Sequence, residues 1–129
     1  MKNNDAPRPD RPYEIRERLA VFAEMVVKAA QKAQARNQIA AALCPNLVRA
    51  AVSAAANSEE ADDPSSPRDF LSKERIALRE IKETRLRLRV LRAAGYLDAD
   101  DHWLVEEAVE LTKILATIIR KRSQGKSRS

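Results

Sequence analysis

The sequence predicts an all-α protein, an antiparallel up-down four-helix bundle. Two observations on composition support this: the 129 residues include only two glycines, and aromatic residues make up 4% of the chain. Alanine, leucine, arginine and glutamate dominate, and these residues favour helix over sheet. Apolar residues also recur every three or four positions along four successive segments. We expect one domain at residues 12–122, between a disordered segment at 1–11 and a disordered basic tail at 123–129.

The first predicted helix begins at Pro12, where a proline loses no hydrogen bond, and ends near Arg36. Its seam consists of Ile15, Leu19, Phe22, Val26, Ala29 and Ala33. Pro45 favours a second helix that starts near Cys44, because proline inside a helix costs about 3 kcal/mol. The alternative is a kinked helix that begins at Gln38. The inward stripe of the second helix consists of Leu47, Ala50, Ala54 and Asn57.

The third helix is the longest predicted element. A linker at residues 62–67, with two prolines and two serines, separates it from the second helix. Residues 68–97 then contain no glycine or proline before Gly95, which we interpret as a C-cap. The expected buried stripe consists of Phe70, Ala77, Ile81, Thr84, Leu88 and Leu91.

The fourth helix is expected over residues 101–122, with Asp98 or Asp100 as its cap. Its seam consists of Leu104, Ala108, Leu111, Leu115 and Ile118. His102, the single histidine, is expected at the helix start as a surface residue rather than a metal ligand. The neighbouring acids lack the glycine and the terminal bidentate glutamate of a calcium loop, so no metal site is predicted.

The sequence favours a non-enzymatic protein without a cofactor. Cys44 lies near a predicted helix start, which could lower the pKa of its thiol, but no histidine base is near it in sequence. Two glycines cannot form a glycine-rich phosphate loop. A single cysteine excludes an intramolecular disulfide, and no run approaches the roughly 18 apolar residues that span a bilayer. Since the N-terminal residues also lack the apolar core of a signal peptide, we expect a cytoplasmic protein with no membrane partner.

The positive charge concentrates on the third helix. The chain has a net charge of +5, and residues 68–92 hold nine cations against four acids. A row of cations at helical spacing can follow the phosphate backbone of RNA or DNA, with strong salt dependence. The residues predicted to contact nucleic acid are Arg68, Arg75, Arg79, Lys82 and Arg89. No aromatic residues lie among them, so base stacking is not indicated. A solvated helix face and a protein–protein interaction module that uses the same arginines are the alternatives.

A second face of the third helix is apolar although it lies opposite the core stripe. It contains Ile76, Leu86 and Val90. These residues could be scattered surface positions, but a subunit interface explains them better, and we therefore expect a homo-oligomer.

Three motifs occur in order along the chain. The first is Leu47 to Ser53 with Asn57 and Glu60. The second is Asp69-Phe70, Ile76 to Glu80 and Glu83 to Arg85 with Leu88, and the third is Glu110-Leu111, Ile114-Leu115 and Ile118-Ile119. This set resembles the bacterial four-helix-bundle proteins that are often encoded by intervening sequences in large-subunit ribosomal RNA genes. The resemblance covers about residues 22–122. It implies an antiparallel four-helix bundle that assembles as a homopentamer, in a family most of whose members have no established activity.

The resemblance also bears on partners and on polar residues. A relative is the accessory variability protein of diversity-generating retroelements, a basic pentamer that binds nucleic acid and a reverse transcriptase. That role depends on neighbouring genes and is not carried over; the implied partners are other copies of this chain, RNA or DNA, and a nucleic-acid-processing protein. The polar residues that match the motifs are interpreted as a structural network that fixes helix register or subunit contacts. They are Arg49, Asn57, Glu60, Glu83 and Arg85.

Overall fold

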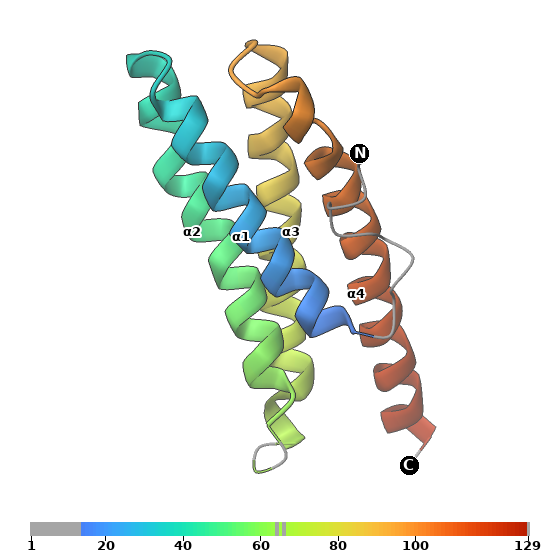
Figure 1. The fold of residues 1–129 in the computed structure, drawn as a ribbon. Coiled ribbons are helices and arrows are strands. Elements are labelled where there is room, and N and C mark those ends of the chain that lie inside the picture. Colours follow the sequence, from blue (N-terminus) through green and yellow to red (C-terminus); the bar gives the residue numbers. More distant parts are fainter. Residues whose placement is uncertain (1–13, 64, 66, 129) are drawn as a thin grey trace.

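The computed structural model describes residues 14–63, 65 and 67–128, and every regular element within these ranges is helical. The α-helices are α1 (Ile15–Gln34), α2 (Gln38–Ala61), α3 (Phe70–Ala93) and α4 (Trp103–Arg128). Two 3-10 helices, η1 (Pro67–Asp69) and η2 (Ala99–Asp101), precede α3 and α4. The four α-helices run alternately up and down, with short connections between successive helices (Figure 1). The all-α four-helix prediction is therefore confirmed.

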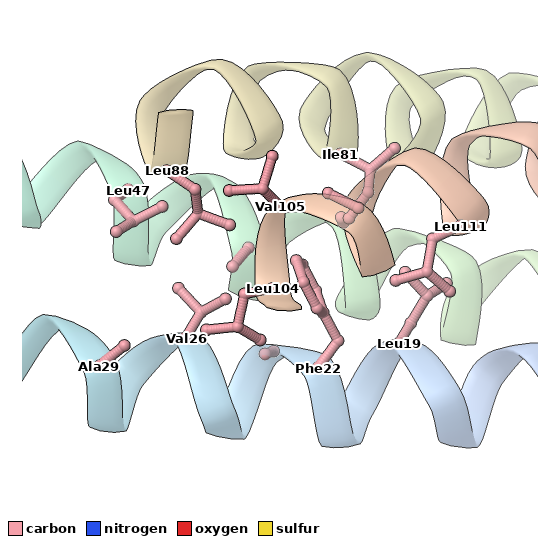
Figure 2. Close-up of a cluster of buried hydrophobic side chains, with 14 of the residues drawn as sticks. Leu19, Phe22, Val26, Ala29, Leu47, Ile81, Leu88, Leu104, Val105 and Leu111 are labelled. Carbon is pink, nitrogen blue, oxygen red and sulfur yellow. The ribbon is translucent and has the colours of Figure 1, made fainter. Parts of the chain in front are cut away.

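The core lies along the axis of the bundle and draws on all four helices. α2 packs between α1 and α3, α4 packs mainly against α3, and of the neighbouring helices α1 and α4 touch each other least. Figure 2 shows Phe22 and Val26 of α1 beside Leu104 of α4, with side chains of α2 and α3 on the other side. Every apolar residue of the predicted α1 seam is buried, and the α4 seam is buried from Leu104 to Leu115.

The start of α2 differs from the favoured prediction and agrees with the alternative. The helix begins at Gln38, not near Cys44, and Pro45 lies inside it. Asn37 supplies the physical reason, because its side-chain oxygen accepts a hydrogen bond from the Ala40 N–H at 2.9 Å and caps the helix. Pro45 is exposed, so water can reach the backbone carbonyl that the proline leaves without a helical donor.

α2 corrects the expectation that no segment of the chain is long and apolar enough to span a bilayer. By length and composition it is the one helix among the described residues that could cross a membrane. Of its most apolar stretch of 18 residues, 33% is buried inside the protein. Core helices of soluble proteins pass the same test. The alanines that make α2 apolar are also the residues that allow α1 and α3 to approach it closely, since Ala50, Ala51 and Ala54 are almost fully buried.

α3 follows its predicted stripe and ends where Gly95 was expected to cap it. The Gly95 backbone is left-handed (φ +80°), and its N–H donates to Arg92 O at 3.0 Å. The Tyr96 N–H donates to Leu91 O at 2.9 Å, which completes a Schellman motif. At the other end Phe70 is only half-buried, and the core position belongs to its neighbour Leu71.

The end of α4 differs from the predicted one, whereas the predicted start of α1 is not tested. The described part of α1 starts at Ile15, while the predicted start at Pro12 and the segment 1–11 lie outside the described residues. α4 continues to Arg128 instead of ending near Arg122. Residues 123–128 contain no proline, and their single glycine costs a helix only about 1 kcal/mol. They therefore continue α4 as its last turns.

Candidate nucleic-acid interface

The predicted row of cations lies on the solvent side of α3 and η1. All five members (Arg68, Arg75, Arg79, Lys82 and Arg89) are exposed. Arg75, Lys82 and Arg89 follow one another at intervals of seven residues, which is two helical turns or about 10.5 Å. The opposite face of α3 is packed into the core through Ala77, Ile81 and Leu88. This burial fixes the direction in which the cations point.

Most of these cations are not neutralised by an acid of the same chain. Within the described ranges, Arg68, Lys82 and Arg89 have no hydrogen-bond or ion-pair partner. Arg75 Nη2 donates to Ser123 Oγ of α4 at 3.3 Å. Arg79 Nη2 lies 3.8 Å from Glu80 Oε2, a long ion-pair distance. The row is therefore an exposed line of positive charge available to an external anion.

An apolar groove lies next to this row, between α2 and α3. It has a volume of about 160 Å³ and is lined by Leu43, Leu86, Val90 and the stems of Glu83 and Arg87. Leu86 is 57% exposed and Val90 is 43% exposed, so two of the three predicted interface residues form one surface. Ile76 does not belong to it, because it is half-buried and lies ten residues, or about 15 Å, from Leu86 along α3.

The predicted polar network forms in part, and it joins α2 to α3. Arg49 Nη2 of α2 lies 2.7 Å from Glu83 Oε2, and Arg49 Nη1 lies 3.2 Å from Glu80 Oε1. Arg87 Nε donates to the same Glu83 oxygen at 2.7 Å. Hydrogen bonds from Arg87 and then Arg49 lower the pKa of the Glu83 carboxyl. The network is thus Arg49, Glu80, Glu83 and Arg87.

The other three predicted members of the network lie apart from it. Asn57 donates to the backbone oxygen of Ser53 on its own helix at 2.9 Å. Glu60 pairs with Lys73 at 2.8 Å near the start of α3. Arg85 is exposed and has no partner among the residues that the structure describes. Its predicted role at a subunit contact stays a prediction.

The most buried ion pair among the described residues was not predicted from the sequence. Arg18 of α1 donates to both carboxylate oxygens of Glu107 of α4, at 3.0 and 2.9 Å. The two residues are only 5% and 2% exposed. A signal was present: Arg18 follows Ile15 by three positions and precedes Phe22 by four, so it lies on the buried stripe.

A second buried acid, Glu74, has no such partner. It is 1% exposed, near the start of α3, and its Oε1 has no hydrogen-bond partner among the described residues. Burial raises the pKa of the Glu74 carboxyl. The hydroxyl of Ser58 on α2 lies near Glu74 and lowers the pKa of its carboxyl, but burial has the larger effect. The Ser58 Oγ and the Glu74 Oε1 do not form a hydrogen bond with each other.

Two of the acids before α4, Asp98 and Asp101, pair with α1, and Asp98 makes no side-chain cap. Lys32 Nζ lies 2.7 Å from Asp101 Oδ2 and 3.4 Å from Asp98 Oδ2. Arg36 forms a further ion pair with Asp98. No side-chain cap is formed at Asp98, so the capping prediction for this residue is wrong. No group of three or more potential ligands that could hold a metal ion occurs within the described residues.

Cys44 does not have the surroundings of a reactive thiol. Because α2 begins at Gln38, Cys44 lies seven residues along the helix and not at its N-terminus. It is buried, and its Sγ contacts Ala30 O at 3.5 Å. Burial raises the pKa of this thiol, which disfavours the nucleophilic thiolate.

Comparison with known proteins assigns a family to this bundle. A family model described as 23S rRNA-intervening sequence protein matches residues 12–117, which include α1 to α3 and most of α4. The chain belongs to this family. The resemblance identified from the three sequence motifs is thereby confirmed. No curated protein and no solved structure gives a match. In this intervening-sequence protein, the exposed α3 row and the adjacent groove lie on a bundle of four helices.

Proposed function

We propose that this chain is a non-enzymatic cytoplasmic scaffold that assembles with copies of itself and binds RNA or DNA through phosphate contacts. The observation that carries the proposal is the exposed row on α3, in which Arg68, Lys82 and Arg89 have no acidic partner among the described residues. Phosphate contacts provide sequence-independent affinity, and a rigid helix holds the cations in a fixed line.

Self-assembly is supported by the groove between α2 and α3. Leu86 and Val90 are exposed beside the α3 row, and contiguous exposed aliphatic residues mark protein contacts. The resemblance to pentameric relatives favours a homopentamer. In a ring, the α3 rows of several protomers would add up, so assembly would strengthen phosphate binding without new contacts within each protomer.

Salt-dependent binding to a labelled duplex tests the nucleic-acid part. The intact chain should bind RNA and DNA duplexes at low salt, and the logarithm of the binding constant should fall linearly with the logarithm of salt concentration. Lys82→Ala should reduce the steepness of that slope by about 1, because one phosphate contact is lost. The matched control is Lys28→Ala, which removes an exposed lysine from α1, away from the α3 row. Equal slopes in the two variants would contradict the proposal.

Light-scattering mass tests the assembly part separately. Leu86→Asp places a charge in the groove and should reduce a multi-subunit mass toward that of the protomer. Ser72→Asp, at an exposed position in the first turn of α3, introduces the same charge outside the groove and should leave the mass unchanged. An assembled protein that does not bind either duplex at low salt would favour the protein-interaction module, in which these cations face an acidic protein surface.

A further inference from the structure

The end of the bundle where α1 and α3 begin and α2 and α4 end contains an unusual buried polar pair. Glu74 of α3 is 1% exposed and Ser58 of α2 is 0% exposed. Neither the Glu74 Oε1 nor the Ser58 Oγ has a hydrogen-bond partner among the described residues. Buried polar atoms without partners are rare in folded proteins, and each calls for a physical explanation. This end of the bundle therefore contains a carboxyl whose charge state affects the packing around it.

The charged groups around Glu74 come from each of the other three helices. They are Arg16 of α1, Asp62 directly after α2, and Arg122 of α4. Both cations already have other partners. Arg16 Nε lies 3.3 Å from Asp62 Oδ2, and the Arg122 guanidinium lies 3.9 Å from the centre of the Phe70 ring. Both cations favour an ionised Glu74, but neither forms an ion pair with it among the described residues, and burial outweighs their effect on its pKa.

We propose that Glu74 is a proton-controlled switch for this end of the bundle. With its proton, the side chain is neutral and stays between α2 and α3. When it loses the proton to solvent, the carboxylate competes with Asp62 for Arg16 and draws water in, so the end of the bundle opens. Every group of this switch belongs to one protomer, so the switch acts without nucleic-acid binding and without assembly.

Glu74 differs from an ordinary packing defect because the free-energy cost of burying it depends on pH. An ionised carboxylate in an apolar site is far more costly than a neutral one, so the cost appears only above the pKa of the group. The Ser58 hydroxyl can donate toward the carboxylate and lowers the pKa of Glu74, but burial outweighs it, so the neutral form stays favoured in the packed arrangement. Opening should therefore increase with pH over the interval between the ordinary glutamate pKa and the raised one.

The first measurement is a carboxyl-carbon NMR titration of the intact labelled chain, with the Glu74 signal assigned through the backbone resonances of the wild-type protein. Glu74 should titrate above the ordinary glutamate range while the protein stays folded. Asp62→Asn frees Arg16 from its partner, so it should shift the Glu74 titration back toward the ordinary range. Asp63→Asn is the matched control, because Asp63 accepts hydrogen bonds from Ser65 instead. Titration of Glu74 in the ordinary range, or equal shifts in the two Asn variants, would overturn the switch.

Hydrogen exchange at several pH values then measures the opening itself. Comparing each amide with the same amide in Glu74→Gln cancels the intrinsic effect of pH on exchange. The ratio should rise by up to about tenfold per pH unit above the ordinary pKa, in residues 15–19 and 70–75. It should stay constant at the opposite end, around Gly95. An equal rise at both ends, or no rise at either, would contradict a local switch, and the NMR titration decides the matter if Glu74→Gln does not fold.

Discussion

Glu107 and Glu74 are two glutamates of the same bundle with almost the same burial and opposite surroundings. Glu107 is 2% exposed and receives two hydrogen bonds from the guanidinium of Arg18. Glu74 is 1% exposed and has an oxygen without any partner in the described part of the chain. Burial alone therefore does not determine what a charged residue does in a core. A paired acid links two helices, whereas an unpaired one makes the packing sensitive to protons.

The largest effect is expected from breaking the paired site. Glu107→Ala leaves the buried Arg18 charge without a partner, and such a change typically costs about 3–5 kcal/mol. α1 and α4 touch least of the neighbouring helices, and this pair joins them across the core. Urea denaturation of wild type and variant measures the difference in the free energy of unfolding.

A double replacement separates the pair from the charge that is left behind. Arg18→Met with Glu107→Leu removes both charges and keeps apolar volume between α1 and α4. This variant should unfold with a free energy close to that of the wild type, because the desolvation cost disappears together with the attraction. If Glu107→Ala were as stable as the double variant, the buried pair would not link the helices.

Replacing the unpaired acid should stabilise the protein, and the gain should depend on pH. Burial raises the pKa of Glu74, so the folded state holds its proton over a range where the unfolded chain has lost it. The stability of the wild type must then fall as pH rises from the ordinary glutamate value through the raised one. Glu74→Gln lacks this loss and should be more stable above that range, by about 1.4 kcal/mol for each unit of pKa displacement. Below it, the two proteins should unfold alike.

The sequence predicted the fold well because the fold depends on periodicity. The number of helices and the seams of α1 and α4 follow from apolar spacing alone. The start of α2 was misplaced because the cost of Pro45 was weighed without the cap at Asn37. The cap contributes only about 1 kcal/mol, and the burial of Ala40 and Cys44 in the first turns of α2 adds to it against the cost of Pro45.

The buried polar groups could be predicted only in part. Arg18 and Glu107 both lie on apolar stripes, three positions after one seam residue and four before the next. That spacing indicates burial but does not identify a partner 89 residues away. The same limit explains the network on α2 and α3, where Arg49 and Glu83 were predicted and Glu80 and Arg87 were not. Which side chains meet depends on how the helices are rotated about their axes.

A moderate effect is expected where an acid is paired at the surface. Arg49→Ala removes the partner that Glu80 and Glu83 share and should lower the free energy of unfolding less than Glu107→Ala does, because the Arg49 side chain is 49% exposed and solvent screens its ion pairs. The pH dependence has the opposite sign to that of Glu74. The lowered pKa of Glu83 means that its contribution is present above the ordinary glutamate value and is lost as pH falls through the lowered one. An Arg49→Ala protein that loses stability in acid as steeply as the wild type would contradict this.

The smallest effect on the protomer is expected at Arg85, and it decides between two roles for that residue. Arg85 is exposed and lies outside the network, although it follows Glu83 by only two positions. Residues two apart on a helix do not face each other, so the carboxylate that binds Arg49 and Arg87 cannot reach it. Arg85→Ala should therefore change the free energy of unfolding by less than about 0.5 kcal/mol. A reduced light-scattering mass at unchanged protomer stability would place Arg85 at a subunit contact, whereas a clear loss of protomer stability would return it to the network that sets helix register.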